Sequence, residues 1–303
     1  MPVPHGIAVT PTNAPAWLAE AVRRAGAEPV DVDSAVALLW YGQDPEELRN
    51  LLKHRDSIRW VQIAWAGVER YRHLMRDGRL WTCAKAVYGE NVAAHALALI
   101  LASFREIPRF ARDRRWAESV GRSLFGARVT IVGAGGITRS LLELLKPFRV
   151  TATVVRRKPH PIKGAFVVAN AELESALHGA DVVVLACALT DETAGMIGLA
   201  QLEAMERHTL LVNVARGQLV RTDDLVSALR AGTIGAAALD VTDPEPLPDE
   251  HPLWGMENVI ITPHSANPDE LGQAPLAQFL VDNVSRFVLR RPLRGRVDVD
   301  AGY

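Results

Sequence analysis

Residues 129–140, VTIVGAGGITRS, carry an apolar run into a glycine-rich turn and then into a helix-like pattern. Gly133 has no Cβ and can make a tight turn, while Gly135 lets the backbone approach a pyrophosphate. A helix that starts near Gly136 and Ile137 would direct its N–H donors and the positive end of its dipole at the same group. The stretch therefore predicts a dinucleotide-binding βαβ unit.

The chain that follows repeats this alternation of strands and helices. Runs such as DVVVLA and TLLVNVA are almost entirely apolar, which is typical of parallel strands covered on both faces. We expect strands at residues 129–132, 150–155, 182–186, 209–212, 235–239 and 259–261. We expect helices between them at 137–145, 171–177 and 223–231. Such a series predicts the doubly wound parallel sheet of dinucleotide-binding proteins.

The chain on either side of this series predicts a second α/β domain. Strands are expected at residues 7–9, 36–39 and 60–63, and helices at 16–25 and 45–53. One long apolar helix is expected over 91–110, and a last helix over 274–289 is expected to return to the first domain. The expected fold class is α/β, with two doubly wound parallel-sheet domains and a cleft between them.

Composition excludes several classes of partner. The chain has 303 residues, 49% of them hydrophobic and 23% charged, and a formal net charge of −1. Nucleic acids and acidic membranes favour a basic excess, which is missing here. No signal-peptide pattern and no apolar run of membrane-spanning length stand out. The two cysteines, Cys83 and Cys187, show no metal-binding spacing, so we expect a cytoplasmic protein without a metal.

A basic cluster follows the second expected strand of the nucleotide-binding series. Arg156, Arg157 and Lys158 stand where NAD-binding proteins carry an acidic residue for the ribose 2′-hydroxyl. The planar donors of arginine can instead hold a 2′-phosphate. The alternative is an ordinary solvated charge cluster. The position favours NADP as the cofactor, with NAD still possible.

Three polar residues each follow a strand and form a candidate catalytic set. Arg216 lies in LVNVARG, Glu245 in DVTDPEPL and His264 in ITPHSA. Since ligands bind at the carboxyl ends of parallel strands, all three are expected at the edge that carries the glycine turn. Hydride addition to a carbonyl needs a proton donor, and histidine, with a reference pKa of about 6.5, serves at neutral pH. A carboxylate would orient the ring, and an arginine would bind a 2-oxo acid. Taken singly, the three would more often be a surface ion pair, turn chemistry and a structural histidine.

The chain resembles the D-isomer-specific 2-hydroxyacid dehydrogenases along nearly its whole length. The matching blocks include RWVQIAWAGVERY, AKAVYGENVAAHALAL, VGAGGI, LTDETAGMIG, LVNVARGQLV, DVTDPEPLPDEHPLW and ITPHSA. The resemblance implies a Rossmann NAD(P)-binding domain at residues 93–267. It also implies a flavodoxin-like substrate domain made of residues 1–92 and 268–303.

The resemblance also implies roles for individual residues. Arg216 would bind substrate, Glu245 would pair with His264, and His264 would be the general acid/base. Asp240 would contact the nicotinamide amide, with Val214 nearby, and Cys187 would line the adenosine side of the cofactor site. Backbone donors for the substrate carboxylate would come from the loop of Ala66, Gly67 and Val68. The apolar helix at 91–110 would form the interface of a homodimer.

Some positions depart from the usual pattern of that family. Thr138 replaces the third glycine of the nucleotide-binding fingerprint, and Ala94 stands where an acidic residue is common. Asn267 takes the place of a glycine, and Trp65 precedes the Ala-Gly-Val loop where smaller side chains are frequent. Trp65 either narrows the substrate mouth or packs in the core.

The expected activity is reduction of a small 2-oxo acid, such as glyoxylate or hydroxypyruvate, to the D-2-hydroxy acid with NAD(P)H. The alternatives are a phosphoglycerate- or phosphite-type dehydrogenase of the same family, and a non-catalytic protein that senses NAD(P).

Overall fold

The computed structural model describes residues 5–113, 115–116 and 118–303. The chain divides into two compact units. Unit 1 consists of the described residues up to Tyr88 together with Pro268–Tyr303, and unit 2 is Gly89–Asn267. Each unit is built around its own parallel sheet, so the expected α/β class with two parallel-sheet domains is confirmed.

Unit 1 holds a five-stranded sheet in the order β2-β1-β3-β4-β5, and all neighbouring strands are parallel. Helices α1 (Ala16–Arg24) and α9 (Asp269–Val288) pack on one face. Helix α2 (Pro45–Leu52) and the 3-10 turn Glu69–Leu74 cover the other. The strands are β1 (Gly6–Thr10), β2 (Glu28–Pro29), β3 (Ala37–Trp40), β4 (Trp60–Ile63) and β5 (Leu80–Cys83).

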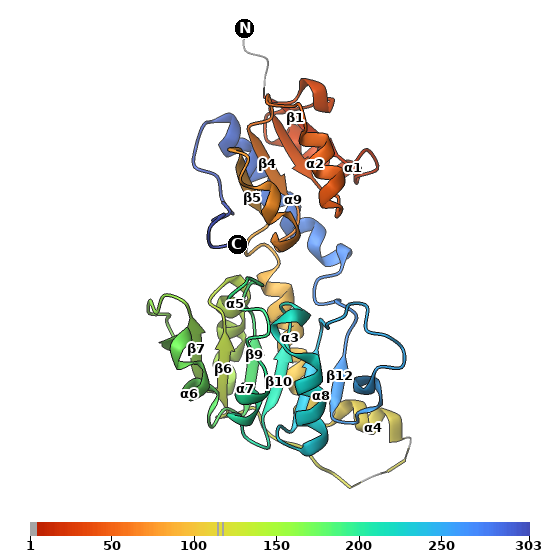
Figure 1. Cartoon of the computed structure of the whole chain (residues 1–303), viewed down its shortest axis with the longest axis vertical. Helices are drawn as coiled ribbons and strands as arrows, with labels where there is room; N and C mark the ends of the chain where they lie inside the picture. Colours follow the sequence, from red (N-terminus) through yellow and green to blue (C-terminus); the bar gives the residue numbers. More distant parts are fainter. Residues whose placement is uncertain (1–4, 114, 117) are drawn as a thin grey trace. The chain divides into compact units, whose positions relative to one another are not determined.

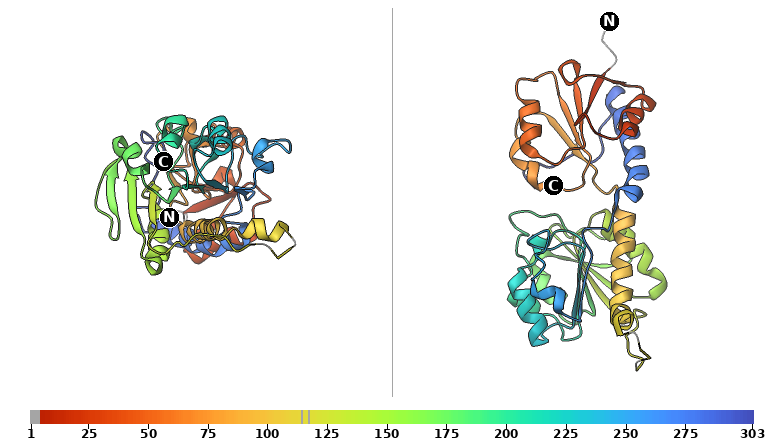
Figure 2. Two further views of the ribbon diagram at one scale, coloured as in Figure 1. Left: turned by 90° about the horizontal axis from the view of Figure 1, so that it is seen from below. Right: turned by 90° about the vertical axis from the view of Figure 1, so that its right-hand side faces the viewer.

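Unit 2 holds a seven-stranded parallel sheet in the order β12-β11-β10-β9-β6-β7-β8. Helix α3 (Gly89–Phe104) and helix α5 (Gly136–Leu145) cover one face. The other face carries α6 (Leu173–Leu177), α7 (Leu199–Glu203) and α8 (Thr222–Ala231), so that helices lie on both sides of the sheet (Figure 2). The strands are β6 (Arg128–Val132), β7 (Thr151–Arg156), β8 (Phe166–Ala169), β9 (Val182–Leu185), β10 (Leu210–Asn213), β11 (Ala236–Leu239) and β12 (Val259–Ile261).

The order of strands places a topological switch in unit 2. From β6 the chain runs outward to β7 and β8, and then returns to β9 on the other side of β6. In open parallel sheets, ligands bind outside the carboxyl ends of the strands where the order reverses in this way. The glycine turn after β6 lies at this point, and Figure 1 shows β6 between β7 and β9.

The single long helix expected over residues 91–110 is wrong. Two helices occupy this region, α3 and α4 (Ile107–Asp113), and the break falls at Arg105 and Glu106. Glu106 has φ 52°, a left-handed value that no α-helix accommodates. Pro108 explains the break, because a proline inside a continuous helix removes one hydrogen bond and clashes with the carbonyl four residues before it.

No helix among the described residues is long and apolar enough to cross a membrane.

Candidate active site

The turn after β6 has the backbone geometry that the glycine motif predicts. Gly133 has φ 114°, and its N–H donates to the carbonyl of Val155 at 2.8 Å. A Cβ on Gly133 would lie 2.5 Å from the carbonyl oxygen of Ala186, so only glycine fits there. A Cβ on Gly135, at the N-cap of α5, would meet no described atom within 4 Å. The turn is therefore closely packed at Gly133 and unobstructed at Gly135, as a pyrophosphate site requires.

Thr138, which replaces the third glycine, is accommodated inside this turn. Its side chain is fully buried, and its hydroxyl donates to the carbonyl of Gly133 at 2.9 Å. Helix α5 is still closely packed, because a Cβ on Gly89 of α3 would lie 2.8 Å from the carbonyl carbon of Gly136. Threonine at position 138 is thus compatible with a helix that packs closely against its neighbour α3.

Two arginines stand beside the glycine turn. Arg156 is the last residue of β7, and the register pairs Val155 with Val132, so Arg156 ends its strand next to Gly133. The guanidinium of Arg156 is partly exposed and donates to the carbonyl of His160 at 3.5 Å, and Arg157 follows as an exposed residue. These two arginines can bind an anionic group of a ligand that extends from the glycine turn toward the end of β7.

Cys187 also lies against the glycine turn. Its backbone nitrogen would be 2.7 Å from a Cβ on Gly133. The thiol is 3.8 Å from the sulfur of Met196, and burial raises the pKa of Cys187 to about 12. Burial therefore disfavours the thiolate, which is the nucleophilic form of cysteine.

Arg216 is carried by a turn that a buried asparagine closes. Asn213, the last residue of β10, donates from its amide to the carbonyl of Arg216 at 2.8 Å and accepts from the N–H of Ala215 at 3.1 Å. A Cβ on Gly217 would lie 1.9 Å from the carbonyl oxygen of Thr242. The turn that carries Arg216 is thus pressed against the loop that leads to Glu245.

His264 and Glu245 are in direct contact. The imidazole Nδ1 lies 2.7 Å from Glu245 Oε1, and the two side chains are 50% and 40% exposed. His264 has φ 51°, and its backbone N–H donates to the carbonyls of Asp240 at 2.8 Å and Thr262 at 2.9 Å. The ring is therefore held from one side by a carboxylate and remains open to a ligand on another.

Asp240 holds the turn that carries His264. Its carboxylate is buried and accepts from the Thr262 hydroxyl at 2.6 Å, the Ser265 N–H at 2.9 Å and the Ala266 N–H at 3.1 Å. His95 of α3 adds its Nε2 at 3.3 Å. Burial raises the pKa of Asp240, but the hydrogen bonds from these four donors outweigh it and lower the pKa below its ordinary value.

The sequence interpretation missed two of these contributors. His95 lies within the apolar helix expected over residues 91–110 and was given no role, although its Nε2 also lies 3.0 Å from the Thr262 hydroxyl. Asn213 was read as part of a motif and given no role. Both are polar residues in otherwise apolar elements, and that is the signal that could have found them. Val214, expected near the nicotinamide, is buried directly after β10.

The loop of Ala66, Gly67 and Val68 lies in unit 1, just beyond the end of β4. Ala66 is exposed, and Val68 is buried beneath it. Among the hydrogen bonds between described residues, none is donated by the backbone N–H of these three residues. The loop therefore has backbone donors to offer to an anion such as a carboxylate.

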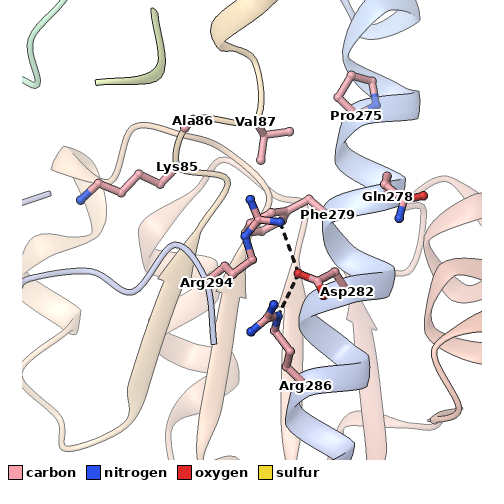
Figure 3. A pocket seen from close by; sticks show the side chains of 9 residues that line it. All are labelled: Lys85, Ala86, Val87, Pro275, Gln278, Phe279, Asp282, Arg286 and Arg294. Carbon is pink, nitrogen blue, oxygen red and sulfur yellow. Dashed lines mark hydrogen bonds and ion pairs between the residues drawn. The ribbon is translucent and has the colours of Figure 1, made fainter. Parts of the chain in front are cut away.

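Unit 1 contains a cavity of about 500 Å³ (Figure 3). It is bordered by α9 and the segment that carries Arg294. Two of its arginines are already paired, because Asp282 accepts from Arg286 at 2.9 Å and from Arg294 at 3.3 Å. None of the residues expected to be catalytic lines this cavity.

Two curated proteins are similar in sequence to this chain over most of its length. An uncharacterized protein in the proB 3′ region of Corynebacterium melassecola is 39% identical over 263 residues, covering 82% of this chain and 84% of that protein. A glyoxylate/hydroxypyruvate reductase of Arabidopsis thaliana is 30% identical over 260 residues, covering 82% of this chain and 79% of that protein.

A solved structure is similar over the full length. The D-isomer specific 2-hydroxyacid dehydrogenase from Xanthobacter autotrophicus Py2, in complex with NADPH and MES, superposes with a TM-score of 0.87 at 26% identity. The match covers 99% of this chain and 100% of that one. Residues 95–266 also match the model of the family's NAD binding domain. The chain belongs to the D-isomer specific 2-hydroxyacid dehydrogenase family.

Proposed function

We propose that this chain is an NADP-dependent reductase of small 2-oxo acids, of the glyoxylate and hydroxypyruvate kind, that forms the D-2-hydroxy acid. The observation that carries the proposal is the 2.7 Å contact between His264 and Glu245. The pair follows β11 and β12, at the edge of the sheet where the glycine turn follows β6. A relative that is matched over 79% of its own length bears the name glyoxylate/hydroxypyruvate reductase, which points to the same substrates.

The side chains of unit 2 divide the work of the reduction. NADPH, when bound, supplies the hydride for the carbonyl carbon of the substrate. His264 donates a proton to the carbonyl oxygen, and Glu245 orients the imidazole and stabilises its charged form. Arg216 offers paired donors to the 2-oxo acid.

The proposal assigns a binding role to each unit. Unit 2 holds the cofactor, with its pyrophosphate at Gly133 and Gly135. Unit 1 offers the free N–H groups of the loop at Ala66 and Gly67 to the substrate carboxylate.

The preference for NADP rests on Arg156 and Arg157. The 2′-phosphate of NADP extends from the adenosine ribose, and two guanidinium groups beside the glycine turn match its charge. NAD has a hydroxyl there, which gains nothing from a second arginine. A related structure, 26% identical, holds NADPH, and this supports the same preference.

The test is a substrate panel. Purified protein should oxidise NADPH, followed at 340 nm, when glyoxylate or hydroxypyruvate is added. His264→Ala should abolish the turnover while NADPH still binds. The matched control is His208→Ala, because His208 also pairs with a carboxylate, Asp181 at 3.0 Å, but stands before β10 at the opposite edge of the sheet. Tight NADPH binding without turnover of any 2-oxo acid would instead identify a sensor.

We also propose a cytoplasmic homodimer. Ile107 of α4 and Phe125 are 54% and 56% exposed, and a second copy of the chain would cover such apolar side chains. Both cysteines are free, which agrees with a reducing compartment. Sedimentation equilibrium should give twice the mass of the chain, and Ile107→Glu should shift the protein toward the monomer.

A further inference from the structure

A row of aromatic side chains crosses the carboxyl edge of the sheet in unit 1. Trp17 lies in the first turn of α1, Tyr41 follows β3, and Trp65 follows β4. The ring centroids of Trp17 and Tyr41 are 6.2 Å apart, and those of Tyr41 and Trp65 are 5.1 Å apart. All three aromatic side chains are partly buried. The row places a wall of rings at the end of the sheet where ligands of parallel folds bind.

The contacts of Trp65 hold its indole in one orientation. Its indole N–H donates to the carbonyl of Gly42 at 2.8 Å, and its own carbonyl accepts from the N–H of Ala84 at 3.0 Å. The tilted contact with Tyr41 holds the other side of the ring. Moving the indole would break a hydrogen bond and an aromatic contact together.

The acceptor of the indole is itself fixed. The carbonyl of Gly42 also accepts from the hydroxyl of buried Tyr71 at 3.0 Å. A Cβ on Gly42 would lie 2.3 Å from the ring of Trp40, so the backbone at this position sits directly on a buried side chain. The hydrogen bond to Gly42 therefore links the indole of Trp65 to buried residues of unit 1.

Trp65 directly precedes Ala66, the first residue of the loop that the proposed function assigns to the substrate carboxylate. In a 2-oxo acid the carbonyl carbon is bonded to the carboxyl carbon, and the substituent begins one bond further on. When the loop N–H groups bind the carboxylate of the substrate, its substituent therefore lies close to the indole of Trp65. A short substituent would be tolerated, while a branched or aromatic one would need room that a fixed ring does not yield.

We infer that Trp65 determines specificity and restricts the substrate to short, unbranched 2-oxo acids. The inference rests on the proposed function, because it uses the same loop. Trp65 touches the substituent and takes no part in proton or hydride transfer, so its replacement should change which acid is reduced and not whether reduction occurs.

The experiment compares kcat/KM for glyoxylate with kcat/KM for two bulky acids, phenylpyruvate and 4-methyl-2-oxopentanoate, with NADPH. In Trp65→Ala the ratio of bulky acid to glyoxylate should rise at least tenfold, equivalent to about 1.4 kcal/mol. Trp17→Ala is the matched control, since it also removes an indole that contacts Tyr41 but not the one beside the loop. Its ratio should stay within twofold of the wild type.

A second variant keeps the test decisive if Trp65→Ala does not fold. Trp65→Leu retains apolar packing and should raise the same ratio at least threefold. An unchanged ratio in an active protein overturns the inference and leaves the proposed function standing. A fall in the ratio also overturns it, because the indole would then be a surface on which bulky substrates stack. Wild-type protein that reduces none of the three acids overturns both.

Discussion

Replacing Asp240 by asparagine tests whether this carboxylate holds the turn of His264. Oδ1 accepts from the hydroxyl of Thr262 at 2.6 Å, the N–H of Ser265 at 2.9 Å and His95 at 3.3 Å. Oδ2 accepts from the N–H of Ala266 at 3.1 Å. In Asp240→Asn the amide oxygen can keep the place of Oδ1, but the amide nitrogen then faces the N–H of Ala266.

The expected loss follows from this count of contacts. One buried N–H loses its acceptor, which costs about 1–3 kcal/mol. The remaining bonds change from charged to neutral ones, and each loses on the order of 1 kcal/mol or less, with some compensation by relaxation. We expect the free energy of unfolding to fall by about 2–4 kcal/mol. Because Ser265 and Ala266 directly follow His264, kcat/KM should also fall at least tenfold, while binding of NADPH falls less.

Urea unfolding gives the stability, and NADPH oxidation with glyoxylate gives the activity. Glu143→Gln is the matched control, because Glu143 forms an exposed pair with Lys146 on α5 of the same unit. Such surface pairs contribute about 0–1 kcal/mol. If the free energy of unfolding of Asp240→Asn lies within about 0.5 kcal/mol of that of this control, the usual range for surface substitutions, Asp240 does not hold the turn.

The sign of the pH dependence follows from the lowered pKa of Asp240. The folded protein favours the charged carboxylate, so its contribution to stability is complete well above the ordinary pKa of 3.8. It is lost as the pH falls through that value toward the lower folded-state pKa. On acidification below pH 5, the wild type should therefore lose stability faster than Asp240→Asn, whose residue 240 does not titrate. Parallel curves would contradict this assignment.

Three further changes test other parts of the site. Replacing Arg156 and Arg157 together by alanine should raise the Kd of NADPH at least tenfold, the equivalent of about 1.4 kcal/mol, and leave that of NADH nearly unchanged. Cofactor fluorescence titration measures both, and equal changes would refute the role in NADP selection. Glu245→Gln should lower kcat/KM and leave the Kd of NADPH nearly unchanged, because the imidazole of His264 loses the carboxylate that orients it; a wild-type kcat/KM would separate Glu245 from the proton donor. Gly217→Ala should lower both Tm and kcat/KM, since its Cβ would lie 1.9 Å from the Thr242 carbonyl, and a variant with wild-type values of both would show that the turn yields freely.

Much of the fold was predictable because the buried strands of unit 2 are continuous apolar runs. The expected strands at 182–186 and 259–261 match β9 and β12 closely. The strands that were missed are short or lie at sheet edges, namely β2, β5 and β8. Edge strands are covered less and carry a weaker apolar signal, so their pairing depends on neighbours that a linear pattern does not show.

The break between α3 and α4 was visible in the sequence but was outweighed by periodicity. The apolar run up to Phe104 favours one continuous helix, whereas Pro108 forbids it. The chain resolves the conflict with a left-handed residue, Glu106. A proline within an apolar helical pattern therefore outweighs the pattern, because its effect is steric.

The candidate site shows which contacts strand order can and cannot predict. Arg216, Glu245 and His264 could be proposed from the sequence because each follows a strand, and parallel strands end at one edge. Their partners depend on register, which brings the last residue of β11, Leu239, beside Ile261 of β12. The residues that follow, Asp240 and Thr262, are thereby placed side by side.

Asp240 and Glu245 lie in the same sequence block, DVTDPEPL, but they support different parts of His264. The carbonyl of Asp240 accepts the N–H of His264, and its carboxylate holds the two residues that follow, so Asp240 sets the backbone of the histidine. Glu245 contacts the imidazole of His264 at Nδ1 and none of these backbone groups, so it sets the direction of the ring. Loss of Glu245 should therefore impair proton transfer with the fold intact, whereas loss of Asp240 should impair both stability and rate. A double variant whose rate defect equals that of Asp240→Asn alone would mean that the ring is not oriented once its backbone support is gone.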